Sequence, residues 1–364
     1  MSSTQGGFRR IRKTYLRPTR LRRLCHLAVG LMAIVGTMPG AMAQDTDDPK
    51  ISWKLGTWGR PRAATASVEA LKRHVEDASG GRFTIAIGYD SFGGPKELLD
   101  LLKIGSLQAV QFCSAYHPEK TPAYTALDLP FLPVADADAQ ERVHEAFHRH
   151  SAVVKELAGW NARLYTSNLL PQFEFMGKGQ PPRRLEDWKG IRVRAIGGLG
   201  DAIRRIGAVP TSMDATEVYT ALERGVVDAV SFPFSYGHAA FRIHELSRWT
   251  TENMSPGTTA CPSVINIEAW NGLPERYRAL IEESKPKAYA AAKAAYAAAD
   301  EKNVPMFRQK GLAFIRYSDP ELAEFRRVAA QPVWDDWVRA REAQGIPGRE
   351  MLTLILDAAS GSKR

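Results

Sequence analysis

Short apolar runs alternate with amphipathic windows along the first part of the chain. The pattern predicts strands at 51–58, 83–87 and 109–113, with helices at 67–79 and 96–104 between them. Parallel strands need a crossover connection of about a dozen residues or more, and helices of this length supply it. We therefore expect a mostly parallel sheet covered by helices, which is an α/β layer.

A second α/β unit is predicted after a long helical window at 136–158. Its strands are expected at 163–167, 190–196, 229–232 and 264–267, with helices at 202–206, 216–224 and 236–246. Two long helical windows follow at 274–309 and 320–344, and the first is expected to be interrupted or bent around Pro305. The sequence has no Ser- or Gly-rich linker, so we expect crossing strands and a shared helix to join the units, which permits hinge closure over a ligand.

The net charge of +9 over 364 residues is unevenly distributed. Residues 1–43 contain eight basic residues and no acidic one, which leaves 41 basic against 40 acidic residues in the rest of the chain. A nearly neutral body gives no electrostatic reason to expect a nucleic-acid partner.

The basic segment has the pattern of an export signal. An apolar run at 27–35 follows the arginines, and Ala41-Met42-Ala43 then gives the small-x-small pattern of a cleavage site before Gln44. The run is shorter than the ~20 residues that span a bilayer. We expect a signal peptide at 1–43, a periplasmic mature protein without direct membrane insertion, and leave the secretion route open.

Enzyme signatures are absent from the sequence. It contains no nucleophile elbow, phosphate-binding loop or zinc-protease motif, and Gly197-Gly198-Leu199-Gly200 lacks the spacing of a dinucleotide loop, so we interpret it as turn glycines and a helix start. His144 and His148 have the i, i+4 spacing of a metal pair, but a solvated helix face is favoured. No cofactor or metal is expected. A disulfide between Cys113 and Cys261 is left open.

The strand that begins at Ile191 carries the most informative chemistry. Alternation sends Arg192 and Arg194 to the same side, opposite Ile191 and Val193. Ligands of open α/β sheets bind at the ends of parallel strands. The planar fork of an arginine makes two charge-assisted hydrogen bonds with a carboxylate, which lysine does not reproduce.

Several ordered motifs surround this strand. They are Lys189-Gly190-x-x-x-Arg194, Gly207-Ala208-x-Pro210, Glu217-Val218-Tyr219-x-Ala221-Leu222 and Gly225-Val226-Val227-Asp228, together with Phe92-Gly93-Gly94, Leu129-Pro130-Phe131, and Asn266 ahead of Trp270-Asn271-Gly272-Leu273-Pro274. In this order the chain resembles the periplasmic solute-binding proteins of tripartite ATP-independent periplasmic (TRAP) transporters. The resemblance covers nearly the whole mature chain.

The resemblance implies a non-enzymatic protein with two α/β domains joined by hinge strands and a long helix. Such proteins close on a small organic acid and deliver it to a membrane permease. The first domain is expected at 44–170 plus about 258–305, and the second at 171–257 plus about 306–364 with the C-terminal helices. Arg194 corresponds to the carboxylate-binding arginine of the family, whereas Arg192 falls on a variable position and is expected to be solvated.

The chain departs from the sugar-acid and C4-dicarboxylate branches at two places. Phe232 stands where those branches often have an Asn, and Gln172-Phe173-Glu174-Phe175 stands where a second basic residue can contribute. The expected ligand is therefore a monocarboxylate with an apolar or aromatic body. A C4-dicarboxylate, or a 2-oxo acid with or without a bound cation, is the alternative, and a periplasmic enzyme is a weaker one.

The remaining candidate ligand contacts are aromatic or hydroxyl side chains near strand ends. Small-ligand pockets are mostly apolar with a few polar anchors. The candidates are Trp58, Phe232, Phe173, Phe175, Tyr89, Ser91 and Tyr116. Because Trp58 and Phe232 come from different α/β units, they can share one ligand only across a cleft.

Overall fold

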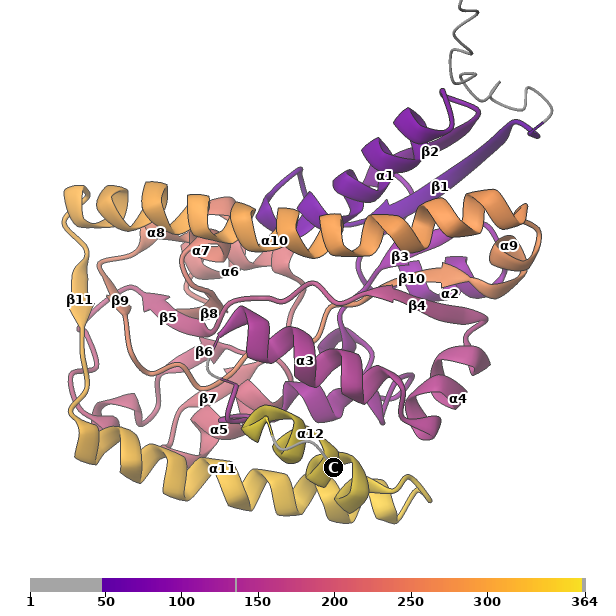
Figure 1. The fold of residues 1–364 in the computed structure, drawn as a ribbon. Helices are drawn as coiled ribbons and strands as arrows, with labels where there is room; N and C mark the ends of the chain where they lie inside the picture. Colours follow the sequence, from indigo (N-terminus) through magenta and orange to yellow (C-terminus); the bar gives the residue numbers. More distant parts are fainter. Residues whose placement is uncertain (1–47, 135, 362–364) are drawn as a thin grey trace, which may run out of the picture. The chain divides into compact units, whose positions relative to one another are not determined.

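Two β-sheets organise the chain (Figure 1). The structure is a computed structural model that describes residues 48–134 and 136–361. The expected signal segment at 1–43 lies outside the described residues. The strand orders are β2-β1-β3-β10-β4 and β11-β9-β5-β8-β6-β7, which confirms the two-sheet α/β fold. The strands expected at 163–167 and 264–267 in the second unit belong instead to the five-stranded sheet, as β4 and β10. We call the five-stranded sheet with its helices lobe I and the six-stranded sheet with its helices lobe II.

Lobe I has a parallel half and an antiparallel half. β1 pairs in parallel with β2 and β3, and β10 runs antiparallel to β3 and β4. The strands are β1 (Ile51–Thr57), β2 (Phe83–Tyr89), β3 (Ala109–Gln111), β4 (Ala162–Thr166) and β10 (Ser263–Asn266), and the helices are α1 (Ala66–Ala78), α2 (Leu98–Lys103), α3 (Ala137–His148), α4 (Ser151–Gly159) and α9 (Ile267–Asn271). The helical window expected at 136–158 is two helices, because His150 caps α4 by accepting a hydrogen bond from the backbone N–H of Ala152.

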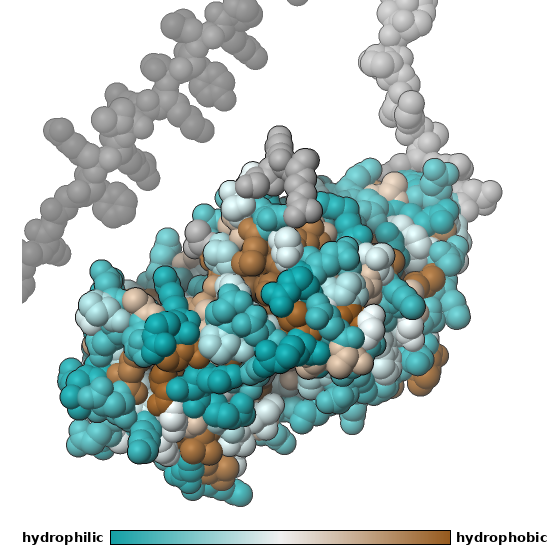
Figure 2. All heavy atoms as spheres, turned by 90° about the horizontal axis from the view of Figure 1, so that it is seen from below, coloured by the Kyte–Doolittle hydropathy of each residue, from teal (hydrophilic) through white to brown (hydrophobic). Residues whose placement is uncertain are grey.

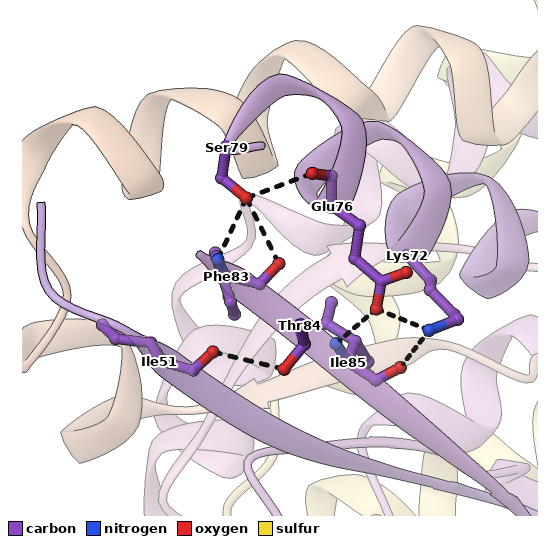
Figure 3. A network of polar contacts seen from close by, with 7 residues as sticks. All are labelled: Ile51, Lys72, Glu76, Ser79, Phe83, Thr84 and Ile85. Carbon is purple, nitrogen blue, oxygen red and sulfur yellow. Dashed lines mark hydrogen bonds and ion pairs between the residues drawn. The ribbon is translucent and has the colours of Figure 1, made fainter. Parts of the chain in front are cut away.

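The connection between α1 and β2 illustrates how lobe I is held together (Figure 3). The carboxylate of Glu76 accepts hydrogen bonds from Lys72 Nζ and from the backbone N–H of Ile85. The Ser79 hydroxyl accepts from the backbone N–H of Phe83 at 3.0 Å. The apolar face of α1 buries Val68 and other side chains against the sheet, so these polar bonds fix the register of the packed pair.

Lobe II carries the strand with the two arginines. Its strands are β5 (Phe173–Gly177), β6 (Arg192–Arg194), β7 (Val209–Thr211), β8 (Ala229–Pro233), β9 (Trp249–Thr251) and β11 (Ala313–Ile315), and its helices are α5 (Gly197–Arg205), α6 (Val218–Glu223), α7 (Tyr236–Ala240), α8 (Ile243–Leu246) and α11 (Asp319–Glu342). α7 and α8 replace the single helix expected at 236–246, because Arg242 adopts a left-handed conformation with φ of 59°.

Three connections join the lobes. The segments 167–172 and 252–262 cross between the sheets, and α10 (Glu275–Gln309) packs against α1 of lobe I and α7 of lobe II (Figure 1). The interruption expected at Pro305 is wrong, since α10 is continuous through Pro286 and Pro305. Its buried side chains contact both lobes, and this packing outweighs the ~3 kcal/mol cost of an internal proline.

The C-terminal helices contact both lobes. α11 packs against α5 of lobe II, whereas α12 (Gly348–Ser360) packs against α3 of lobe I. The domain boundaries expected from the sequence stay a proposal.

The face that carries α11 is mostly hydrophilic, with hydrophobic side chains in separate patches (Figure 2). Among the described residues, none of the helices is long and apolar enough to cross a membrane.

Candidate functional site

A small cavity lies where the two lobes meet. Lobe I, lobe II and both crossing segments line it, and its volume is about 30 Å³. The lining residues are Trp58, Arg62, Ala64, Cys113, Tyr116, Asn168, Leu170, Phe173, Arg194, Ile196, Ala215, Phe232, Pro233, Tyr236, Phe241, Thr259 and Cys261. Ligand pockets commonly reach ~300 Å³ or more. The walls must therefore separate before an organic acid can enter.

Arg194 is the buried cation of this cavity, with 0% of its surface exposed. Its Nε and Nη2 donate to the carbonyl oxygen of Met213 at 3.2 and 3.0 Å, and its Nη1 donates to the carbonyl oxygen of Ser231 at 3.1 Å. The guanidinium lies 4.7 Å from the ring centre of Phe232. Within the described part of the chain Arg194 forms no ion pair. A buried charge without a counterion is costly, so the site favours an anion.

Tyr116 brings lobe I to the same point. It ends the 3₁₀ helix Ser114–Tyr116, and its hydroxyl accepts hydrogen bonds from Arg194 Nη2 at 3.0 Å and from the backbone N–H of Ala215 at 3.1 Å. Because both of these groups donate, the hydroxyl proton of Tyr116 is available for a ligand oxygen.

Aromatic rings form the walls around these polar groups. Trp58 and Tyr116 meet edge to face at 6.2 Å, and Phe232 stacks on Phe241 at 4.9 Å. Phe173 lies at the start of β5, where the chain enters lobe II, and also lines the cavity. The arrangement combines one cation and one hydroxyl with apolar walls, which suits an acid with an apolar body.

Arg62 also lines the cavity, although it was not among the residues expected from the sequence. It follows β1, and its Nη1 donates to the carbonyl oxygens of Trp58 and Arg60. Its guanidinium lies 5.1 Å from the ring centre of Trp58 and 6.0 Å from that of Phe241. The only sequence signal is its place four residues after Trp58, beyond the end of a strand.

Three of the candidate contacts lie outside the cavity. Phe175 is two residues further along β5 than Phe173 and packs against Trp188 at 4.8 Å in the core of lobe II. The hydroxyl of Tyr89 donates to Glu69 at 2.8 Å, and burial together with that carboxylate raises the pKa of Tyr89 to about 12. Ser91 is exposed in the loop after β2.

Arg192 has a different environment from Arg194. Its exposed guanidinium makes a two-point ion pair with Asp228, with Nε–Oδ2 and Nη2–Oδ1 distances of 2.9 and 2.6 Å. This ion pair holds the pKa of Asp228 below its usual range. Arg192 already has its counterion.

The expectation of a solvated face at His144 and His148 is wrong, because both side chains are buried. His144 Nδ1 is 2.5 Å from the Ser167 hydroxyl, and His148 Nε2 contacts the Tyr124 hydroxyl. Burial lowers the pKa of His144 to about 3. In residues 48–134 and 136–361 no group of three potential ligands is placed to hold a metal ion.

The open question of the cysteines is resolved by a disulfide between Cys113 and Cys261. It ties the residues after β3 to the crossing segment 252–262, and both cysteines line the cavity.

The lobes also touch beside the cavity. The start of α5 packs on Asp128, where a Cβ atom at Gly197 would lie 3.3 Å from Asp128 Cβ. Asp128 accepts hydrogen bonds from the Ser114 hydroxyl and the backbone N–H of Ala260, but burial still raises the pKa of its carboxyl group to about 7. Lys96 of lobe I pairs with Asp214 of lobe II at 3.0 Å.

Both the sequence and the fold match known proteins. The family model described as bacterial extracellular solute-binding protein, family 7, matches residues 57–340. The monocarboxylate 2-oxoacid-binding periplasmic protein of Nostoc sp. (strain PCC 7120) is 22% identical over 247 residues, and the match spans 66% of this chain and 66% of that protein's length.

Solved structures share the fold, including two that hold aromatic acids. A marine metagenome TRAP solute-binding protein, described as specific for aromatic acid ligands and bound to metahydroxyphenylacetate, superposes with a TM-score of 0.75 at 21% identity, over 86% of this chain and all of that one. A TRAP solute-binding protein from Rhodoferax ferrireducens T118 with copurified benzoate gives a TM-score of 0.76 at 20% identity, over 85% of this chain and 98% of that one.

Proposed function

Since this chain belongs to family 7 of the bacterial extracellular solute-binding proteins, which serve TRAP transporters, we propose that its ligand is a monocarboxylate with an apolar or aromatic body. The family is periplasmic and non-enzymatic, and it binds small organic acids. The protein would capture the acid between its lobes and deliver it to a membrane permease.

The observation that carries the proposal is the environment of Arg194. Its guanidinium is buried at the cavity and forms no ion pair with a described residue, and the neighbouring Tyr116 hydroxyl has a proton to donate. A ligand carboxylate would supply the missing counterion and accept from both groups, as arginine–carboxylate recognition requires.

The apolar body is supported by the walls. Trp58, Phe173, Phe232 and Phe241 all line the cavity, and no Asp or Glu is among its lining residues in the described chain. Related folds that hold metahydroxyphenylacetate and benzoate are consistent with an aromatic body. The Nostoc relative, named for 2-oxoacids, keeps a 2-oxo acid as the competing ligand class.

A panel of acids tests the proposal. The mature protein is incubated with benzoate, phenylacetate, pyruvate and succinate, and its melting curve is recorded while the recovered acid is analysed by chromatography. A bound acid at one hundred times Kd should stabilise the protein by ~2.7 kcal/mol. Stabilisation by the aromatic acids, with the acids recovered unchanged, is expected. Stabilisation by pyruvate or succinate alone would reject the aromatic body, and turnover of any acid would reject a binding function.

Closure is the remaining part of the proposal. A cavity of about 30 Å³ is too small to hold an organic acid unless the lobes separate, and α10 with the two crossing segments offers the hinge. Small-angle scattering should therefore give a smaller radius of gyration with a saturating ligand than without it. An unchanged radius at saturation would count against hinge closure.

A further inference from the structure

We propose that Arg62 is a specificity-determining residue that holds a second oxygen substituent on the body of the ligand. This inference rests on the proposed function and deepens it. The ligand would be a monocarboxylic acid with its carboxylate at Arg194 and a hydroxyl or carbonyl oxygen at its far end.

The first observation is that Arg62 is held in place by the protein. The Thr65 hydroxyl accepts from the Arg62 backbone N–H at 3.0 Å and donates to the Arg62 carbonyl oxygen at 2.8 Å. The Arg62 side chain donates to the carbonyl oxygens of Trp58 and Arg60 through Nη1, and it also bonds to the Tyr236 side chain. The guanidinium is therefore positioned before any ligand arrives, which lowers the entropy cost of binding.

The second observation is that one donor of Arg62 is unpaired among the described residues. Its Nε is buried and has no hydrogen-bond partner in the described chain. The guanidinium forms no ion pair within those residues either, although Arg192 on the outer surface is fully paired with Asp228. An unsatisfied buried donor on a charged group is unfavourable and calls for an acceptor.

The third observation is where the two arginines stand. Arg62 belongs to lobe I and Arg194 to lobe II, and both line one cavity with aromatic walls. The Arg62 guanidinium lies against Trp58 and Phe241, whereas that of Arg194 lies against Phe232. A ligand that reaches both must have an acceptor at each end of an apolar body.

The chemistry of the guanidinium selects the second group. Arginine donates hydrogen bonds and accepts none. A hydrocarbon end or an ammonium group leaves the buried Nε donor of Arg62 unpaired, whereas an oxygen acceptor pairs with it. A site with buried donors discriminates strongly against an analogue that lacks the acceptor.

Isothermal titration with matched acids tests the assignment. Benzoate is compared with 3-hydroxybenzoate, 4-hydroxybenzoate and 3-formylbenzoate, and pentanoate is compared with 4-oxopentanoate as an aliphatic pair. The proteins are wild type, Arg62→Met, Arg62→Lys and Arg60→Gln. Methionine keeps most of the apolar contact without the donors, and Arg60 is an exposed neighbour whose replacement removes the same charge.

Wild type is expected to bind at least one oxygen-substituted acid about tenfold or more tighter than its unsubstituted parent. In Arg62→Met this preference should shrink to about twofold, while the parent acid binds within about threefold of wild type. Arg62→Lys should lie between the two, and Arg60→Gln should match wild type. Melting curves establish that each variant is folded.

Three results would overturn the inference. Equal weakening of parent and substituted acids in both Arg62 variants would place Arg62 on the same carboxylate as Arg194. Equal affinity of wild type for both members of every pair would leave Arg62 without a role in selection. Failure of every acid to bind would reject the proposed function itself and this inference with it. A preference seen only in the aliphatic pair would reject the aromatic body and retain the role of Arg62.

Discussion

Arg194 Nη2 donates a hydrogen bond to the hydroxyl oxygen of Tyr116 at 3.0 Å, and this bond joins the two lobes. Arg194 lies at the end of β6 in lobe II, and Tyr116 lies in the 3₁₀ helix after β3 in lobe I. The group that we assign to the ligand carboxylate therefore also takes part in the contact between the lobes. Ligand binding and lobe closure should be coupled through this pair.

Replacement of Arg194 should weaken binding severely. Arg194→Ala leaves a buried carboxylate without its partner, at a cost of ~2 to 5 kcal/mol. Affinity should fall about thirtyfold to several thousandfold at ~1.4 kcal/mol per tenfold. Arg194→Lys keeps the positive charge but loses the planar guanidinium, so its affinity should lie between those of wild type and Arg194→Ala. Titration of folded variants measures this.

Arg192→Ala is the matched control for that series. Arg192 is exposed and already paired with Asp228, so its loss should leave affinity almost unchanged. Near-normal binding by Arg194→Ala would show that the carboxylate site lies elsewhere.

The Tyr116→Phe substitution tests the role of the Tyr116 hydroxyl, which accepts a hydrogen bond from Arg194 Nη2. The substitution removes an acceptor for Arg194 Nη2 and for the Ala215 N–H, and also a donor for the ligand. Hydrogen bonds to charged groups contribute ~1.5 to 3 kcal/mol, so affinity should fall about tenfold to 150-fold. Tyr89→Phe removes a hydroxyl that bonds to Glu69 outside the cavity and should bind normally. Equal affinities of the two variants in titration would contradict the role of Tyr116.

The disulfide between Cys113 and Cys261 should stabilise the fold, because it closes a loop between residues 148 positions apart. Replacing both cysteines by alanine should lower the free energy of unfolding by ~2 to 5 kcal/mol. Urea denaturation of wild type and the double variant measures the difference. Identical midpoints and slopes would mean that the bond adds nothing to stability.

The sequence was informative where residues with a distinct chemistry occur in a recognisable order along the chain. The period of the strands and helices predicted the two α/β layers, because each layer needs crossover helices of a minimum length. The ordered motifs around Arg194 pointed to a carboxylate site, since few residue types bind a carboxylate at two points.

The sequence was uninformative where burial depends on partners distant in the chain. His144 and His148 have the same spacing on a solvated helix as on one that is buried against Ser167 and Tyr124. The alternation of side chains along a strand does not distinguish Phe173 from Phe175, which are two positions apart. Only Phe173 lies at the strand end that faces the cavity. Arg62 takes its position from Thr65, a cap that sequence pattern alone did not reveal.

Acid should weaken the fold through His144. Burial lowers its pKa to about 3 in the native state, whereas in the unfolded chain it titrates near ~6.5. Between these values the unfolded state binds one more proton, so stability rises with pH and is lost as pH falls below about 6.5, by ~1.4 kcal/mol per unit. The His144→Asn variant has no imidazole to protonate at this position, so it should lack this loss of stability at low pH. The variant should be less stable than wild type at pH 7.5, and the difference should narrow by pH 5 in urea denaturation. A difference that stays constant with pH would contradict the prediction.

The last prediction concerns the contact between α5 and Asp128. A methyl group at Gly198 would overlap the carbonyl oxygen of Asp128 and lie 3.0 Å from Pro130 Cδ, so alanine does not fit while the lobes touch. Overpacking of this kind costs ~1 to 3 kcal/mol, and Gly198→Ala should lower affinity about fivefold to 150-fold by opposing closure. The unliganded protein should melt normally, because Asp128 is bonded to Ser114 of lobe I and the overlap with its carbonyl oxygen is relieved when the lobes separate. Gly159→Ala is the control, since a Cβ atom there meets nothing within 4 Å. Titration measures the affinity of Gly198→Ala, and small-angle scattering measures its contraction on ligand binding. A normal affinity with a normal contraction would mean that this contact plays no part in closure. A large loss of stability in the unliganded variant would mean the same.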